Sequence, residues 1–215
     1  MAIWRGRSDL IYNNKFHPPQ LTIKTAISMI PTHRHLPNAT TVIPSLTQPQ
    51  TSNWSPPRSG RMKIHTDGAW DPNLNLGGLG IVARDSAGLF HYAAALPINV
   101  CSTEEAELRA IWIAIKKARD WKITSLEVES DALFVVQRLQ QRNYNGTWRT
   151  DALLKDIASW VSAFDFISFA FAPRNCNRVA HELAQWGKQN QTEMYWSISP
   201  FWLLHALGGD MTSVS

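Results

Sequence analysis

The chain has only two cysteines, Cys101 and Cys176, among its 215 residues. Two isolated cysteines without a CxxC pair exclude a disulfide-stapled scaffold and indicate free thiols in a reducing compartment. The sequence also lacks an apolar run of transmembrane length, which excludes a membrane-spanning protein. We therefore expect a protein without a membrane partner, in the nucleus or cytoplasm rather than in an organelle.

Acidic residues are nearly absent from positions 1–60, where Asp9 stands against six Lys and Arg residues. The same segment carries eight prolines among many Ser, Thr, Asn and Gln residues. This composition buries too little apolar surface to offset the entropy of ordering, so it predicts a flexible basic leader with at most a short helix around residues 21–30. It also fits a transit peptide. Removing residues 1–58 should then leave the stability of the protein nearly unchanged.

Residues 61–190 have a different composition, since their fifteen Lys and Arg residues nearly balance fourteen Asp and Glu residues. The basic excess of the chain therefore belongs to the leader, and net charge alone is a weak indication of a nucleic-acid partner. An apolar content of 44% with ten tryptophans is enough for a hydrophobic core. We expect one folded domain at 61–190 and a C-terminal tail at 191–215 that frays from about residue 205.

The domain alternates between strand-like and helix-like segments. Alternating or continuous apolar runs predict strands at residues 62–67, 78–84, 89–96, 125–130 and 166–172. Apolar periodicity and capping signals predict helices at residues 102–120, 132–141, 150–163 and 177–189. Three antiparallel strands followed by helices interleaved with two further strands indicate an α/β fold, a five-stranded mixed sheet with helices on its faces.

Three carboxylates stand at positions that an ordinary core does not explain. Asp67 ends the first predicted strand, Asp131 follows the fourth, and Glu107 shares an apolar helix face with Ile111 and Ala114. Carboxylates from three elements repel one another when they converge, unless a cation lies between them. The pattern therefore outlines a metal site.

Each carboxylate also has a simpler interpretation. An Asp before Gly is a common turn residue, which applies to Asp67. Asp131 could cap the following helix, and Glu107 could be a helix-start carboxylate stabilised by the helix dipole. His181, taken alone, reads as a half-exposed helix residue. Their joint placement is what favours a functional site.

Several ordered segments resemble the ribonuclease H family, and more narrowly the ribonuclease H-type domain of plant non-LTR retroelement reverse transcriptases. The segments are residues 64–69, the glycines at 77, 78 and 80, residues 107–110, residues 129–131 and residues 173–184. Upstream, residues 4–15 resemble the connector that precedes this domain, and residues 53–57 resemble its final hinge. The leader thus has a second interpretation as a retroelement connector.

The resemblance implies a ribonuclease H-like sheet in which strands 1–3 are antiparallel and strands 4 and 5 are parallel to strand 1, with helices on both faces. It also implies hydrolysis of the RNA strand of an RNA–DNA hybrid with two divalent ions. Asp67, Glu107 and Asp131 match the first three acidic positions and would hold Mg²⁺, with Mn²⁺ as an alternative ion. Two such ions can activate a water and stabilise the leaving oxygen.

The fourth position departs from the family pattern, because His181 replaces an aspartate there. As a catalytic residue in that place, an imidazole would bind Mg²⁺ poorly and Mn²⁺ better, so the sequence predicts weak Mg²⁺ activity and a gain on His181→Asp. The catalytic set expected from the sequence is Asp67, Glu107, Asp131 and His181.

The candidate nucleic-acid contacts combine basic side chains with aromatic ones. Arg142, Tyr144, Trp148 and Arg149 lie in one predicted loop, and Arg174 precedes the last helix. Such side chains could stack on sugars and hold phosphates, although a solvated loop with one anchored aromatic is an equal alternative. We weigh a monomeric hybrid ribonuclease against a non-catalytic nucleic-acid-binding module that has kept the fold.

Overall fold

The computed structural model describes residues 54–211, and the side chains of residues 54–208. Its strands are β1 (Met62–Asp71), β2 (Leu76–Arg84), β3 (Phe90–Asn99), β4 (Ser125–Ser130), β5 (Phe166–Phe171) and β6 (Met194–Trp196). Its helices are α3 (Thr103–Asp120), α4 (Leu133–Gln140), α5 (Asp151–Val161), α6 (Arg178–Asn190) and α7 (Leu204–Met211). Short 3-10 turns precede α6 and α7.

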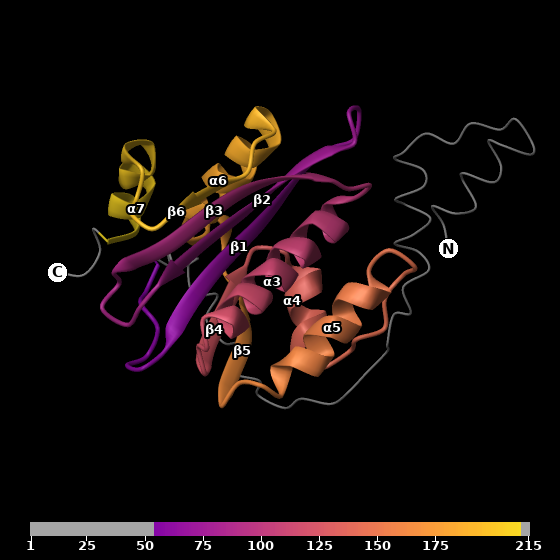
Figure 1. Cartoon of the computed structure of the whole chain (residues 1–215), viewed down its shortest axis with the longest axis horizontal. Coiled ribbons are helices and arrows are strands. Elements are labelled where there is room, and N and C mark those ends of the chain that lie inside the picture. Colours follow the sequence, from indigo (N-terminus) through magenta and orange to yellow (C-terminus); the bar gives the residue numbers. More distant parts are fainter. Residues whose placement is uncertain (1–53, 212–215) are drawn as a thin grey trace, which may run out of the picture. The chain divides into compact units, whose positions relative to one another are not determined.

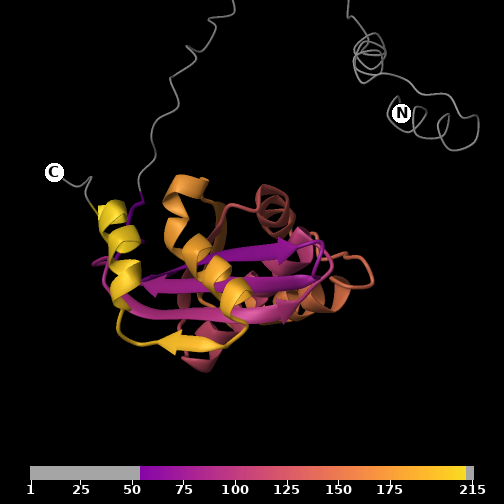
Figure 2. The same ribbon diagram turned by 90° about the horizontal axis from the view of Figure 1, so that it is seen from above.

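The strands form one mixed sheet in the order β5-β4-β1-β2-β3-β6. β1, β2 and β3 pair antiparallel, while β4 pairs parallel to β1 and β5 parallel to β4, which confirms the predicted α/β fold and strand directions. The predicted count of five strands is wrong. β6 adds a sixth strand beside β3 (Figure 2), and its three residues are too few to form a recognisable period.

Helices cover both faces of this sheet. α3, α4 and α5 lie on the face that is towards the viewer in Figure 1, and α6 crosses the opposite face. The larger core cluster lies under α3, where Leu79, Ile81 and Leu126 meet Ile111 and Ile115. A smaller cluster lies under α6 and α7. Successive residues of a strand point to opposite faces, so each strand contributes to both clusters.

Two glycines let helices approach the sheet at the places that matter for the candidate site. A Cβ at Gly68 of β1 would overlap the α3 backbone at Ala106 and Glu107. A Cβ at Gly80 of β2 would overlap the backbone of α6 at Ala180. Because glycine has no Cβ, both helices pack directly on the strands. This close packing brings Glu107 from one face and the first turns of α6 from the other towards the same part of β1.

The expected tail at 191–215 is wrong for residues 194–211. β6 pairs with β3, and α7 lies where a frayed end was expected, with Leu203 and Ala206 buried in the smaller core cluster. Short segments with isolated apolar residues show too little periodicity to predict a strand or helix. Leu203 and Ala206 are buried only because the surface of α6 packs against them. No helix within residues 54–211 is long and apolar enough to span a bilayer.

The expected domain start near Arg61 is also too late. Trp54 is only 6% exposed, and the Arg84 guanidinium lies 4.5 Å from its ring centroid. Close by, the Lys63 ammonium donates to the carbonyl of Ser55 (2.9 Å). Trp54 anchors the described residues that precede β1, so removing residues 1–58 would take away buried surface. The helix expected around residues 21–30 lies outside the described residues.

Candidate metal centre

Three carboxylates converge where β1 and β4 diverge. Asp67 lies within β1, not at its end as predicted, but it is the first residue of β1 beyond the pairing of Thr66 with Ser130. Asp131 directly follows β4. Glu107 projects from the first turns of α3, and one oxygen from each of the three side chains lies within 4.8 Å of the others.

The Glu107 carboxyl is held in a nearly dry position, 6% exposed. The hydroxyl of Ser130 donates to its Oε2 (3.4 Å), and the same hydroxyl accepts the Ala132 N–H (3.1 Å). Burial raises the pKa of Glu107 well above its usual value, and the charges of Asp67 and Asp131 raise it further. At the start of the same helix, the Ser102 hydroxyl accepts the Glu105 N–H as an N-cap, and the Glu105 carboxylate accepts the Cys101 N–H. Glu107 does lie near the start of α3, as its alternative interpretation requires, but it is buried there, whereas Glu104 in the first turn is exposed.

Asp131 is half-buried, and its pKa is raised by burial and by the neighbouring charge of Asp67. Asn177 opposes this shift, because its amide nitrogen donates to Asp131 Oδ1 (3.1 Å). The same nitrogen donates to the carbonyl of Thr66 (3.0 Å). The sequence did not indicate a role for Asn177 in the site, because an Asn directly before a helix is typical of an N-cap. Its side chain makes no capping hydrogen bond to α6.

The three carboxylates fit a divalent cation. They repel one another, and within residues 54–211 none of them forms an ion pair with a Lys or Arg side chain. Carboxylate oxygens are the ligands that hard cations such as Mg²⁺ prefer, and a bound cation removes the repulsion that raises the two pKa values. Asp67, Glu107 and Asp131 could therefore hold a divalent ion.

His181 lies on α6 beside this cluster. Its Nδ1 is 3.1 Å from Asp67 Oδ2, while its ring nitrogens are 3.0 Å (Nε2) and 3.5 Å (Nδ1) from a terminal nitrogen of Arg174. The structure thus brings His181 and Arg174 to the carboxylates. It does not include His181 in the group whose ligand atoms converge.

The five candidate nucleic-acid contacts do not form one surface. Trp148 is 83% exposed, and Arg149 packs over its ring (4.1 Å to the centroid) while lying 3.8 Å from Glu105 at the start of α3. Arg142 and Tyr144 instead line a cavity of about 510 Å³ between α5 and β5, and Tyr144 packs partly against the core. Trp148, Arg149 and Arg174 thus lie near elements that carry the carboxylates, whereas Arg142 and Tyr144 lie elsewhere.

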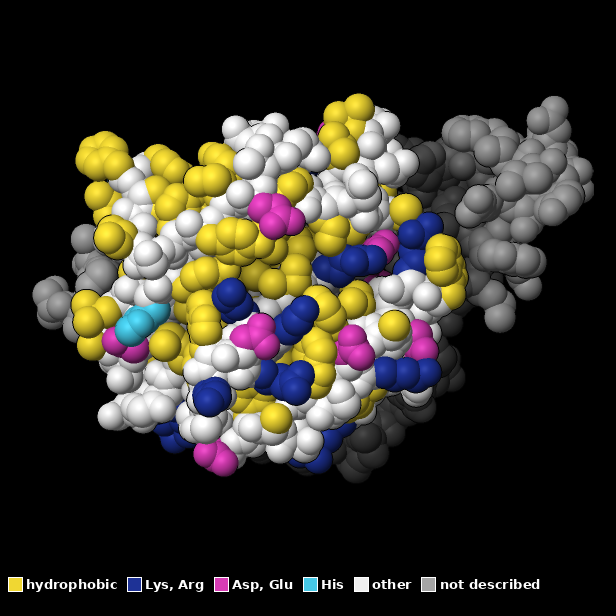
Figure 3. Space-filling view, viewed as in Figure 1, with side chains coloured by type: hydrophobic (Ala, Val, Ile, Leu, Met, Phe, Trp, Pro, Cys, Tyr) yellow, Lys and Arg dark blue, Asp and Glu magenta, His cyan; other side chains and the backbone are white. Residues whose placement is uncertain are grey.

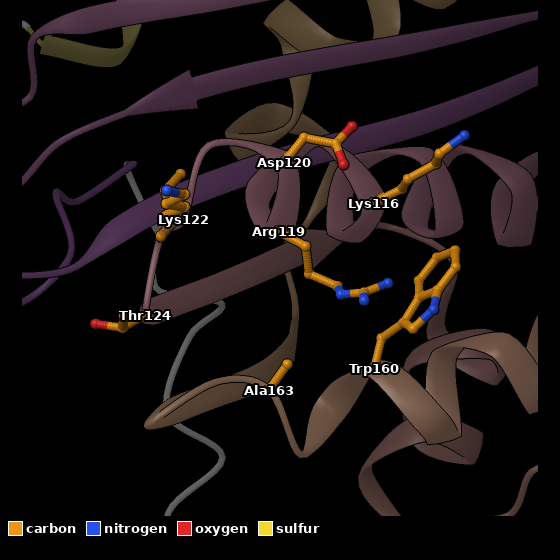
Figure 4. Close-up of a pocket in the computed structure, with 8 residues that line it drawn as sticks. Lys116, Arg119, Asp120, Lys122, Thr124, Trp160 and Ala163 are labelled. Carbon is orange, nitrogen blue, oxygen red and sulfur yellow. The ribbon is translucent and has the colours of Figure 1, made fainter.

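A basic hollow of about 430 Å³ lies at the opposite end of α3 (Figure 4). Lys116, Arg119 and Lys122 line it, and Figure 4 shows the Arg119 guanidinium directed towards Trp160 of α5, at 4.9 Å from its ring centroid. Lys and Arg side chains also gather over this part of the surface in Figure 3. Cations at the C-terminal end of a helix are stabilised by its dipole. Twelve residues separate Glu107 from Arg119, about 18 Å along the helix axis.

Comparison with known proteins identifies the domain. Residues 65–187 match the family described as reverse transcriptase-like. An Arabidopsis thaliana protein provisionally named a ribonuclease H protein is 33% identical over 148 residues, which cover 67% of this chain and 24% of that protein. The chain therefore spans about a quarter of the length of this relative.

Two solved structures show the same fold at low identity. RNase H1 of the archaeon Halobacterium salinarum has a TM-score of 0.55 and 21% identity, over 60% of this chain and 98% of that one. The structure of LC11-RNase H1 in complex with an RNA/DNA hybrid has the same four values. With a family match over more than half of its length and this shared sheet topology, the chain belongs to the reverse transcriptase-like family and contains a ribonuclease H-like domain.

Proposed function

We propose that the protein is a metal-dependent endonuclease that hydrolyses the RNA strand of RNA–DNA hybrids. The convergence of Asp67, Glu107 and Asp131 is the observation that carries this proposal, because the mutual repulsion of these carboxylates is relieved when a cation lies between them. The family and the name of the Arabidopsis relative support a nuclease, and the hybrid bound by LC11-RNase H1 supports the substrate.

In this proposal the three carboxylates hold Mg²⁺, with Mn²⁺ as an alternative. The bound ions would supply an activated water and stabilisation of the leaving oxygen. The protein's own residues orient this cluster: Ser130 holds Glu107, and Asn177 connects Asp131 to the Thr66 carbonyl of β1. Low exposure of Asp67 and Glu107 keeps their charges poorly screened by solvent.

Trp148 and Arg149 are the best placed substrate contacts. An exposed indole backed by a guanidinium offers a stacking surface and a phosphate-binding cation side by side. Arg149 reaches the N-terminal end of α3, where it lies 3.8 Å from Glu105, two positions before Glu107 in the sequence. Discrimination between RNA and DNA would depend on the 2′-hydroxyl and on the shape of the minor groove.

The direct test is incubation of the purified chain with a hybrid labelled separately on each strand, with Mg²⁺, with Mn²⁺ and with chelator. We expect metal-dependent cleavage of the RNA strand alone. Asp67→Asn, Glu107→Gln and Asp131→Asn should each abolish it, while Asp165→Asn, at an exposed aspartate in the loop between α5 and β5, should not. Near wild-type cleavage by any of the three variants would remove that residue from the catalytic set.

A second candidate is a non-catalytic nucleic-acid-binding module. The contact of His181 with Asp67 favours it, because the fourth position of the site offers an imidazole in place of a carboxylate and a guanidinium lies beside it. This candidate predicts hybrid binding without cleavage in either metal. Electrophoretic mobility shifts run beside the cleavage assay separate the two functions.

A further inference from the structure

The contact between His181 and Asp67 defines the protonation of one ring nitrogen. An ionised carboxylate only accepts hydrogen bonds, so in the contact of Nδ1 with Asp67 Oδ2 at 3.1 Å we assign the proton to Nδ1. A protonated ring nitrogen has no lone pair for a metal ion. In this arrangement Nδ1 is a donor to a metal-binding carboxylate, and it is not itself a ligand.

The other ring nitrogen is blocked by charge. A terminal nitrogen of Arg174 lies 3.0 Å from Nε2 and 3.5 Å from Nδ1, distances that place the guanidinium across the ring. Arginine stays charged and cannot be deprotonated in a protein. A divalent ion bound at Nε2 would therefore lie against a fixed positive charge, which repels it.

The position of His181 relative to the cluster agrees with these two contacts. The group whose ligand atoms lie within 4.8 Å of one another contains Asp67, Glu107 and Asp131, without His181. The imidazole remains 27% exposed, whereas the Asp67 side chain is 5% exposed. His181 thus lies between a buried ligand and solvent.

We propose that His181 is a positioning residue for Asp67, held in place by Arg174, and that it is not a fourth metal ligand. The metal part of this inference rests on the proposed function. Histidine would then orient the Asp67 carboxylate as outer partners orient metal ligands, an effect that typically amounts to 10–100-fold in affinity or activity. Arg174 would act through His181 and not through a phosphate.

The first test needs no substrate. Nitrogen-15 NMR of the metal-free full chain reports which imidazole nitrogen of His181 carries a proton, with the signals assigned by their loss in His181→Asn. We expect a proton on Nδ1, retained when Mg²⁺ is added. An Nδ1 without a proton in either state would overturn the inference.

The second test compares three substitutions by calorimetric titration with Mn²⁺ and by hybrid cleavage. Asparagine carries its amide nitrogen two bonds from Cβ, as histidine carries Nδ1, so His181→Asn should keep the donor, and its loss of affinity should be well below the roughly 10–100-fold of a lost outer partner. His181→Leu should weaken Mn²⁺ binding by about 10–100-fold. His181→Asp adds a carboxylate to the cluster and should bind Mn²⁺ more tightly than wild type in either case, so it checks that the titration detects an added charge at this position.

A different result for the two neutral variants would identify a ligand. Equal losses of Mn²⁺ affinity in His181→Asn and His181→Leu would overturn the positioning role. Failure of the proposed function has a different signature. In that case the wild type neither cleaves the hybrid nor binds Mn²⁺, while the NMR result still decides the role of His181.

Arg174 offers a kinetic distinction. If it acts through His181, Arg174→Met should lower kcat and leave the hybrid KM unchanged. If it held a phosphate, the same change would raise KM at constant kcat, which would contradict the inference. Arg174→Lys is the matched control for charge, because it keeps a cation without the planar contact across the ring.

Discussion

The Asn177 amide nitrogen lies 3.1 Å from Asp131 Oδ1 and connects the start of α6 to the end of β4. The neighbouring Asn177 Oδ1 is buried and has no hydrogen-bond partner within the described part of the chain. The orientation of the amide is unambiguous, because both atoms near its nitrogen, Asp131 Oδ1 and the Thr66 carbonyl, are acceptors. Asn177 therefore has a fixed role in the shape of the site.

Replacing Asn177 should impair both stability and cleavage. Asn177→Ala leaves the Thr66 carbonyl without this donor, which costs about 1–3 kcal/mol of unfolding free energy. It also frees the Asp131 carboxylate, so cleavage should fall about 10–100-fold, as for other outer partners of metal ligands. Urea unfolding and hybrid cleavage measure the two effects. Asn190→Ala, at an exposed asparagine of the same helix, is the control.

Glu107→Gln should abolish cleavage but stabilise the metal-free protein. The pKa of Glu107 is raised on folding, so its contribution to stability is fully present below the unfolded value of about 4.5 and is lost as the pH rises through the folded value. The stability gain of Glu107→Gln over wild type should therefore grow between pH 5 and pH 8. Thermal unfolding in chelator at several pH values checks this difference.

Divalent ions should remove that difference. Bound Mg²⁺ or Mn²⁺ favours the ionised carboxylate, and a ligand that binds only the folded state raises the stability by mass action. We expect the wild type to gain thermal stability with millimolar metal and Glu107→Gln to gain less. Equal metal-dependent shifts in the two proteins would mean that Glu107 does not contact the ion.

Trp54→Ala should destabilise the domain although the residue precedes the first strand. Truncating a buried tryptophan typically costs about 3–5 kcal/mol, and Trp54 is 6% exposed. Trp148→Ala removes the same side chain from a site that is 83% exposed, so its stability should be nearly that of wild type. Equal unfolding midpoints for Trp54→Ala and wild type would mean that the folded domain starts near Arg61, as the sequence predicts.

Trp148 and Arg149 should contribute to hybrid binding. Loss of a stacking aromatic weakens binding by about 1–3 kcal/mol per base. Loss of one phosphate contact makes the slope of log K against log salt concentration less steep by about 0.9 for a duplex. Fluorescence anisotropy of Trp148→Ala and Arg149→Gln with Asp67→Asn in the background measures binding without cleavage. Lys116→Gln, in the basic hollow at the far end of α3, should change the affinity much less.

Local sequence patterns were sufficient for the main elements of the domain. The run from Ser125 to Ser130 alternates between buried and half-buried positions, and the helix that follows Ser102 has an apolar face and a capping residue. These signals depend on neighbours a few positions away, so they are readable without a tertiary structure. The same patterns failed for β6, whose three residues become a strand only by pairing with β3.

The three carboxylates were also identifiable from the sequence, because a charged residue on an apolar stripe or at a strand end stands out locally. The arrangement of these carboxylates depends on contacts with residues that are far away in the sequence. Asp67 and His181 are 114 positions apart, and Asn177 is 46 positions from Asp131. No local pattern distinguishes a histidine that binds a metal from one that donates to a carboxylate.

The sequence by itself thus determined the fold class and which acidic side chains could act, since both follow from residue type and short-range periodicity. Only the tertiary structure decided how the site is arranged. It placed Arg174 across His181, Asn177 against Asp131 and Trp54 in the core, and it separated Tyr144 from Trp148. The physical reason is that the burial of a side chain and the direction of its hydrogen bonds depend on how elements distant in the sequence pack together. In this domain, that packing includes the close approach of α3 to Gly68 of β1 and of α6 to Gly80 of β2.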